Sequence, residues 1–198
     1  MGMQGPARPG HLWAALAAAL AAGALLLWWA PAALLDWQPQ WALTEPWRLW
    51  SAAFVHWSPL HLGANLLGTA LVAALGVAAA APTRLAGAWF VAWPLTHLGL
   101  LARPELAHYG GLSGVLHAGV AATALWLVCA ARGRRRAIGV ALLAGLLAKL
   151  LTEEPWGAAL RHPAGWDIAI APLAHATGTL AGALCAVVAW ARPRPFRR

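Results

Sequence analysis

The chain contains few charged residues and very few acidic ones. Of its 198 residues, 10% are charged, 61% are hydrophobic, and six are Asp or Glu. A soluble domain carries roughly 25% charged and 45–50% apolar residues. The composition therefore excludes an ordinary soluble enzyme, and it also excludes a disordered chain, which has low hydrophobicity. What remains is a protein that crosses a membrane several times.

Cysteine and metal-binding motifs are scarce as well. The two cysteines, Cys129 and Cys185, lie in apolar runs, where we expect them to pack as small hydrophobic side chains rather than as a disulfide framework. A His-Glu-x-x-His zinc motif is absent from the sequence. The two aspartates, Asp36 and Asp167, fall at the edges of predicted loops. We therefore expect no metal, no organic cofactor and no pair of intramembrane aspartates.

Long apolar runs, broken by charge, Pro or Gly, predict six membrane-spanning helices. A span needs roughly 20 apolar residues, so a chain of this length holds about six spans and no soluble domain. We expect one all-α membrane domain over 1–198, with a short N-terminus at 1–10 and a basic tail at 192–198. The first run is too long for a signal peptide and lacks a clear cleavage site, so it is expected to be an uncleaved span. The predicted spans are 11–35, 58–81, 85–102, 111–131, 136–152 and 168–191.

Basic residues concentrate on one predicted side of the membrane. With six spans, both termini and the loops at 82–84 and 132–136 share one side, and the positive-inside rule makes that side cytoplasmic. All six acidic residues fall on the opposite side. Membrane topology and contact with the lipid bilayer thus explain the net charge of +8. We expect no nucleic acid as a partner. The basic residues on the cytoplasmic side are Arg8, Arg84, Arg132, Arg134, Arg135, Arg136, Arg192, Arg194, Arg197 and Arg198.

Three predicted spans carry polar residues near the same face of the membrane. The spans at 58–81, 111–131 and 168–191 all descend from the outer side. Their polar residues fall in the first two turns, within roughly 10 Å of the outer end. Polar side chains inside spans are costly and usually functional. These residues are His56 at the mouth, then His61, Asn65, Ser113, His117 and His175.

This set of side chains allows nucleophilic catalysis. Ser113 needs a base to remove its proton, and His175 is the candidate. The span of His175 contains no Asp or Glu, and the nearest acid before it is Asp167, eight residues earlier and just outside the span, so we expect a dyad without an acid. His61 and Asn65 share one helix face, and they could stabilise an oxyanion together with the Ser113 amide at its helix start.

Glycines in two of these spans favour close approach of the backbone. Gly111 precedes Leu112 and Ser113, and its missing Cβ leaves room for a neighbouring group. Gly178 and Gly182 follow His175 in the last span. Small residues at this spacing let one membrane helix pack tightly against another, which a hydrogen bond between Ser113 and His175 requires.

Together these residues give the chain a resemblance to the rhomboid family of intramembrane serine proteases. The resemblance implies a six-helix bundle with a water-filled cavity open to the outer side and a gate at span 136–152 and loop 153–167. It implies that Ser113 is the nucleophile, His175 the general base, and His61 and Asn65 part of the oxyanion site. The matching motifs are Trp47-Arg48, His56, His61, Asn65, Gly111-Leu112-Ser113-Gly114, His175, Gly178 and Gly182.

One position differs from the usual family pattern. Many rhomboids carry Tyr four residues after the nucleophile, whereas this chain has His117. The chain resembles the rhombosortase branch in three features, namely His117, its small size, and the pair formed by Lys149 and Glu153. That resemblance implies a bacterial inner-membrane enzyme whose transmembrane substrates are secreted proteins with C-terminal Gly-Gly sorting tails. By spacing alone, Lys149 and Glu153 form a structural ion pair at the outer end of their span.

Other interpretations stay open at this stage. A non-catalytic rhomboid-like protein that binds transmembrane helices is the main alternative, although the intact Ser113 and His175 argue against it. A small-solute channel is a third reading, and its flux would survive loss of Ser113. Structural roles are expected for Arg48, which would brace the loop at 36–57, and for the many tryptophans, which would anchor that loop at the membrane interface. The oligomeric state is left open.

Overall fold

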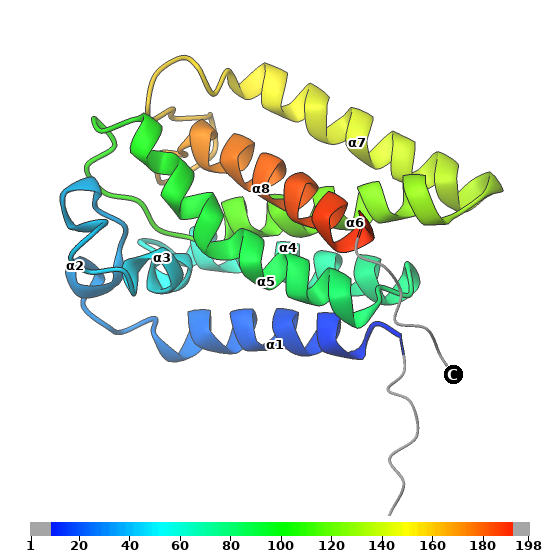
Figure 1. Cartoon of the computed structure of the whole chain (residues 1–198). Helices are drawn as coiled ribbons and strands as arrows, with labels where there is room; N and C mark the ends of the chain where they lie inside the picture. The colour runs from blue at the N-terminus through cyan, green and yellow to red at the C-terminus, as the bar shows by residue number, and fades with distance from the viewer. Residues whose placement is uncertain (1–8, 192–198) are drawn as a thin grey trace, which may run out of the picture.

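Six long helices form the body of the protein over the residues that the structure describes. The computed structural model describes residues 9–191, and within that range all regular elements are helices apart from two isolated β-bridges, so the all-α prediction is confirmed (Figure 1). The helix α1 lies at one edge of the bundle and α7 at the opposite edge. The predicted tail at 192–198 and residues 1–8 lie outside the described residues. The long helices are α1 (His11–Leu26), α4 (Pro59–Ala78), α5 (Thr83–Leu98), α6 (Ser113–Ala130), α7 (Gly133–Glu153) and α8 (Pro172–Ala191).

Within residues 9–191, four segments are long and apolar enough to cross a membrane. They are Pro59–Ala78, Thr83–Ala102, Ser113–Ala130 and Pro172–Ala191. The helix α7 is long, but basic residues at 134–136 and the Lys149 and Glu153 pair shorten its uncharged stretch. The helix α1 is apolar but only 16 residues long. The chain is thus a multi-pass membrane protein by composition, and the count of six spans stays a prediction.

The first predicted span extends too far. The helix α1 ends at Leu26, and a separate short helix, α2 (Ala32–Leu35), follows it. Pro31 lies between the two, and a proline has no N–H with which to continue a helical ladder. The expected helix through residue 35 is therefore wrong, because local turn chemistry overrides the hydropathy of the run.

The loop after α2 is compact and is held by Arg48, as predicted. The loop contains η1 (Pro39–Trp41), α3 (Arg48–Ser51) and η2 (Ala52–Phe54). The buried Arg48 guanidinium donates to the carbonyl oxygens of Asp36 at 2.8 Å and Ala33 at 3.0 Å, and it pairs with the Glu45 carboxylate at 2.5 Å. These contacts satisfy a buried charge, so Arg48 sets the shape of the loop.

Not every aromatic residue of this loop lies at an interface. Trp47 is half exposed, as an interfacial anchor should be, but Trp37 is fully buried. The backbone of Trp37 exchanges hydrogen bonds of 2.8 and 3.0 Å with Tyr109. The expectation of an interfacial Trp37 is wrong because the loop folds back and forms a second small core. That pairing also ties the loop to the segment that leads into α6.

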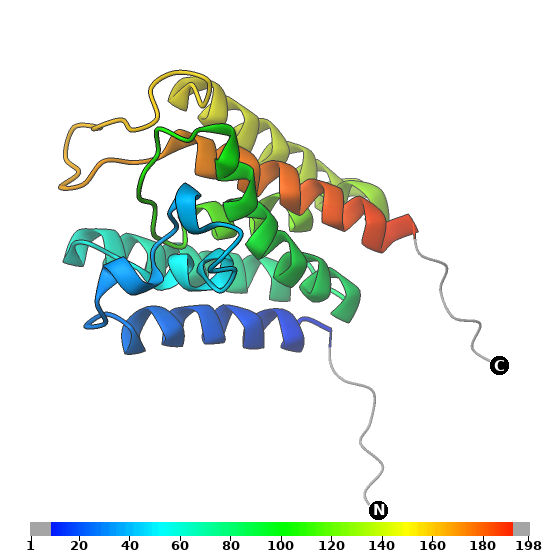
Figure 2. The ribbon, with the colours of Figure 1, turned by 60° about the vertical axis from the view of Figure 1, so that its left-hand side comes forward.

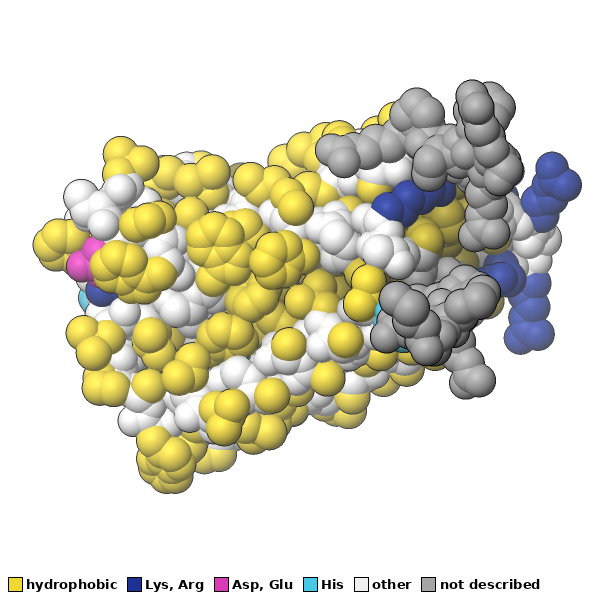
Figure 3. All heavy atoms as spheres, turned by 60° about the horizontal axis from the view of Figure 1, so that its bottom comes forward, with side chains coloured by type: hydrophobic (Ala, Val, Ile, Leu, Met, Phe, Trp, Pro, Cys, Tyr) yellow, Lys and Arg dark blue, Asp and Glu magenta, His cyan; other side chains and the backbone are white. Residues whose placement is uncertain are grey.

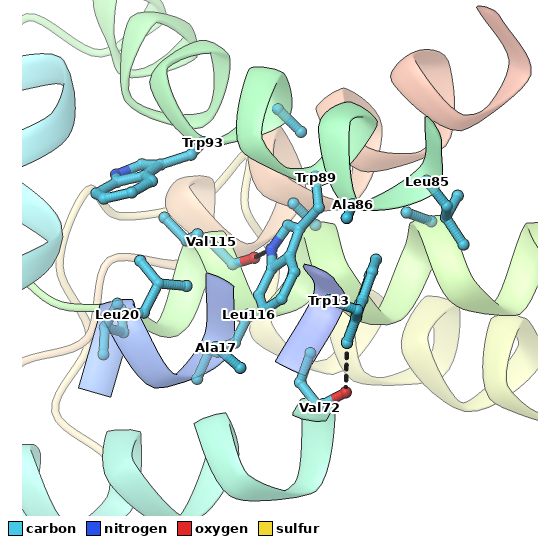
Figure 4. Close-up of a cluster of buried hydrophobic side chains, with 14 of the residues drawn as sticks. Trp13, Ala17, Leu20, Val72, Leu85, Ala86, Trp89, Trp93, Val115 and Leu116 are labelled. Atoms are coloured by element: carbon cyan, nitrogen blue, oxygen red, sulfur yellow. Dashed lines mark hydrogen bonds between the residues drawn. The ribbon is translucent and has the colours of Figure 1, made fainter. Parts of the chain in front are cut away.

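Stacked tryptophans join α1, α5 and α6 in the main core. The rings of Trp13 and Trp89 lie 4.4 Å apart (Figure 4). Trp13 Nε1 donates to the carbonyl oxygen of Val72 at 2.9 Å, and Trp89 Nε1 donates to that of Val115 at 2.8 Å. A buried indole N–H is costly without such a partner, so these bonds fix the positions of α4 and α6.

Glycines bring α6 and α8 into backbone contact, as predicted. A Cβ added at Gly178 would overlap the carbonyl oxygen of Gly114, and one added at Gly182 would overlap that of Ala118. Only glycine leaves this space. The close crossing sets the separation between the beginnings of the two helices, where Ser113 and His175 lie.

The outer surface shows the charge asymmetry of the sequence. In Figure 3 hydrophobic side chains cover most of the visible face, and Lys and Arg gather at one end. The first residue of α1 and the last residue of α8 lie at the same end of the bundle (Figures 1 and 2). A broad apolar band with one basic end fits a bilayer better than water.

Candidate active site

Ser113 is the first residue of α6, and a glycine turn presents it. Gly111 has φ +118°, in the region that favours glycine, and its N–H donates to the carbonyl oxygen of Ala52 at 2.9 Å. A Cβ at Gly111 would lie 2.6 Å from His61 Nε2. Leu112 is fully buried and holds the turn in the core. Glycine is therefore required at this position by both backbone conformation and space.

The structure brings Ser113 and His175 together. His175 lies in the first turn of α8, and its Nε2 is 3.0 Å from Ser113 Oγ. The imidazole is buried, with 5% of the residue exposed. A hydroxyl donating to an imidazole nitrogen at this distance is the arrangement that general-base activation of serine requires.

An acid that the sequence did not predict also contacts His175. Glu153 Oε2 lies 2.6 Å from His175 Nδ1, and the other Glu153 oxygen pairs with Lys149. The expected dyad without an acid is therefore wrong for this structure. The predicted ion pair of Lys149 and Glu153 is present, but it also reaches the imidazole.

The sequence does not reveal this contact because the acid comes from a different helix. Glu153 ends α7, the preceding helix along the chain, whereas the span of His175 itself contains no acid. The sequence carries one signal for this contact. Glu153 follows the predicted outer end of a span, on the same predicted side of the membrane as Ser113. Which helix ends adjoin one another depends on packing, and no local pattern encodes it.

His117 packs against the His175 ring. The two imidazoles are stacked, with centroids 4.2 Å apart and planes 9° from parallel. His117 Nδ1 donates to the carbonyl oxygen of Ser113 at 2.7 Å, one turn earlier in α6. His117 therefore packs against the plane of the His175 ring and is itself held by the first turn of α6.

His61 and Asn65 face the same region from α4. Both are buried, and both lie beside Gly111, where an added Cβ would be 3.5 Å from Asn65 Nδ2. Ser58 caps α4 by accepting the His61 N–H at 3.0 Å, which fixes the first turn of the helix. Their amide and imidazole groups therefore line the cavity beside the glycine turn that precedes α6.

His56 supports this group from outside the cavity. Its ring lies 4.7 Å from that of His61, and its Nδ1 donates to the carbonyl oxygen of Phe54 at 3.1 Å. Burial lowers the pKa of His56, because a charged imidazole loses its hydration there. His56 is therefore a neutral packing partner of His61, in line with the structural role expected for it.

A cavity of about 1100 Å³ connects these side chains. Its walls are α4, α6, α7 and the segment 160–171, which belongs to the connection between α7 and α8 that extends beyond the helix ends in Figure 2. Ser58 Oγ donates to Asp167 at 2.8 Å and so ties this connection to α4. Within residues 9–191 no group of three or more His, Cys, Asp or Glu side chains is arranged to hold a metal ion. The polar lining includes His61, Asn65, Ser113, His117, Glu153 and His175.

A comparison with protein-family models finds one match that covers these residues. The model described as Rhomboid domain matches residues 43–192, which is more than half of the chain and includes every residue of the cavity named above. No curated protein matches the chain. The matched range begins after α1 and ends one residue beyond α8.

Proposed function

The chain belongs to the rhomboid family, and from that premise we propose that it is an intramembrane serine endopeptidase. Its substrates are single-span membrane proteins, cut within or beside their transmembrane segment. The observation that supports this proposal most strongly is the 3.0 Å contact between Ser113 Oγ and His175 Nε2 inside a large cavity. The family generally comprises serine proteases that act within the membrane.

In the proposed reaction Ser113 attacks the scissile carbonyl while His175 removes its proton. The negative oxygen that forms would be held by the Ser113 amide, His61 and Asn65. His175 then protonates the leaving amine, and the acyl-enzyme is hydrolysed by water that enters the cavity. The substrate helix must unwind before this step, because a helix keeps its carbonyls in internal hydrogen bonds.

The topology forms part of the proposal. Both termini would lie in the cytoplasm, and the cavity would open to the outer side of a bacterial inner membrane. The charge distribution supports this orientation, since basic residues cluster at the end where α1 begins and α8 ends. Water for hydrolysis would then come from the periplasmic side.

A narrower proposal concerns the substrate. On the rhombosortase resemblance, the substrates would be secreted proteins that end in a Gly-Gly motif, a transmembrane helix and a basic tail. The stacked His117 and the Lys149 and Glu153 pair support this assignment. A reporter carrying such a tail should be cut, whereas the same reporter with Val-Val in place of Gly-Gly should stay intact. Equal cutting of both reporters would refute the narrower proposal.

Labelling with a fluorophosphonate probe tests the reaction class. We expect wild-type protein in detergent to be labelled, and Ser113→Ala and His175→Ala to lose labelling while keeping their melting temperatures. The matched control is Ser51→Ala, because Ser51 lies in α3 and donates to the carbonyl oxygen of Leu35, away from the cavity. This control should label as wild type does.

The alternative is a non-catalytic protein that binds transmembrane helices. Labelling that persists in Ser113→Ala would reject Ser113 as nucleophile. Folded wild-type protein that takes no label, and cuts no single-span reporter in liposomes, would favour the helix-binding alternative. A channel would instead show solute flux that survives loss of Ser113.

A further inference from the structure

We propose that Glu153 is a positioning residue that turns the Ser113 and His175 pair into a triad. This inference rests on the proposed function and concerns the same site. It starts from the contact of 2.6 Å between Glu153 Oε2 and His175 Nδ1. Glu153 does not touch the reacting atoms, so it acts through the imidazole.

The hydrogen bond selects the tautomer of His175. A carboxylate only accepts hydrogen bonds, so the nitrogen that faces Glu153, Nδ1, must carry the proton. The lone pair of a neutral imidazole is then on Nε2, the nitrogen that lies 3.0 Å from Ser113 Oγ. Without Glu153 the ring could adopt the other tautomer, in which Nε2 carries a proton and cannot accept one.

The carboxylate also stabilises the charged form of the ring. When Ser113 attacks, its O–H bond breaks, an N–H bond forms at Nε2, and a bond forms between Oγ and the substrate carbon. His175 then holds a positive charge in a buried place, where an adjacent negative charge stabilises it strongly. The proton passes to the leaving amine, and Glu153 stays ionised throughout.

Glu153 is held in place from two sides. One oxygen pairs with Lys149, one turn earlier on α7, which leaves the other oxygen free to face His175. The end of α7 is anchored by the next segment, where Arg161 donates to the carbonyl oxygen of Thr152 at 3.1 Å. The side chain of Glu153 is 13% exposed, whereas the neighbouring Glu154 is 59% exposed and pairs with Arg161. The two carboxylates thus have different partners, and only Glu153 faces the site.

The test uses the full chain in detergent and the saturation kinetics of a fluorophosphonate probe. Glu153→Gln keeps the size of the side chain and removes its charge. We expect the maximal rate of labelling to fall by about 10⁴-fold, the loss seen when the acid of a serine triad is replaced. The half-saturating probe concentration should stay within about threefold, because Glu153 does not contact the probe. Glu154→Gln is the matched control and should label as wild type does.

Chemical rescue separates positioning from a merely structural role. Glu153→Ala should regain at least about tenfold in labelling rate when sodium formate replaces sodium chloride, since the small carboxylate can enter the space that the side chain leaves. Glu154→Ala should show no such response. If Glu153 only helps α7 to fold, formate should not restore the labelling rate of Glu153→Ala.

The outcomes distinguish this inference from the proposed function. If Glu153→Gln labels within threefold of wild type while Ser113→Ala does not label, the triad is wrong and the serine protease stands. A slow Glu153→Ala variant that formate does not accelerate also refutes the positioning role. If folded wild-type protein neither takes label nor cuts a single-span reporter in liposomes, the proposed function fails, and this inference fails with it.

Discussion

At the residue scale, three side chains from two other helices contact the imidazole of His175. Ser113 and His117 both belong to α6, whereas Glu153 ends α7. Ser113 faces Nε2, His117 stacks on the plane of the ring, and Glu153 faces Nδ1. In the proposed reaction these contacts would set the reacting nitrogen, the plane and the tautomer of the ring. The orientation of the imidazole is therefore held by more than one contact, as expected where a side chain must keep a narrow range of geometry.

The oxyanion proposal predicts a specific effect for Asn65. Removing one donor from an oxyanion site costs about 10²- to 10³-fold in rate, because the donor acts mainly in the transition state. We expect Asn65→Ala to lower the fluorophosphonate labelling rate by about that factor, with little change in melting temperature. Labelling kinetics and a thermal shift assay would measure the two effects.

Thr69→Val provides the control for Asn65→Ala. Thr69 lies one turn further along α4, and its hydroxyl donates to the carbonyl oxygen of Asn65 at 2.7 Å. The substitution perturbs the same helix face without removing a donor from the cavity. An Asn65→Ala variant as fast as Thr69→Val would exclude Asn65 from the oxyanion site.

At the element scale, the contact between α6 and α8 sets the distance across the site. Gly114 and Gly178 meet in the same turns of these helices that carry Ser113 and His175. Since the side chains project from rigid helices, a shift of one backbone against the other changes the Ser113 to His175 distance directly. The close packing is thus a requirement of the site as well as of stability.

Gly178→Ala tests this relation. The added methyl would overlap the carbonyl oxygen of Gly114, so the helices must separate. We expect a loss of about 1–3 kcal/mol in stability, typical of overpacking, and at least a tenfold loss of labelling rate. Gly87→Ala in α5 is the control, because nothing lies within 4 Å of its added Cβ. A Gly178→Ala variant with wild-type melting temperature and rate would show that the contact is not limiting.

At the scale of the whole molecule, basic and acidic side chains lie at opposite ends of the helix bundle. Lys and Arg side chains gather at the end of the molecule where α1 begins and α8 ends, and acidic side chains are visible at the opposite end (Figures 1 and 3). An apolar band separates the two ends. This arrangement predicts one orientation in the membrane, with the cavity facing outward.

Single cysteines report that orientation directly. In a background with Cys129 and Cys185 replaced by Ala, Ala158→Cys in the connection after α7 should react with a membrane-impermeant maleimide added to intact cells. Arg134→Cys at the start of α7 should react only after the cells are permeabilised. Both positions are exposed, so access through the membrane decides the result. The reverse pattern would show that the proposed orientation is wrong.

Much of this protein follows from local patterns in its sequence. Five of the six predicted spans correspond closely to long helices, because hydropathy and turn residues act over short stretches of chain. The polar residues His61, Asn65, Ser113 and His175 could be chosen because all lie near the same end of three helices. The glycines at 178 and 182 indicated close packing for the same local reason.

Only the tertiary structure decided which side chains meet. It ended the first helix at Leu26, buried Trp37 in a second core, and brought Glu153 to His175 from a neighbouring helix. Such contacts join residues far apart along the chain, and they depend on how helices cross rather than on any periodicity. The sequence by itself thus determined an all-helical membrane protein with a serine and a histidine at one depth. The fold decided that a carboxylate stands behind the histidine, because only packing brings the end of α7 to the start of α8.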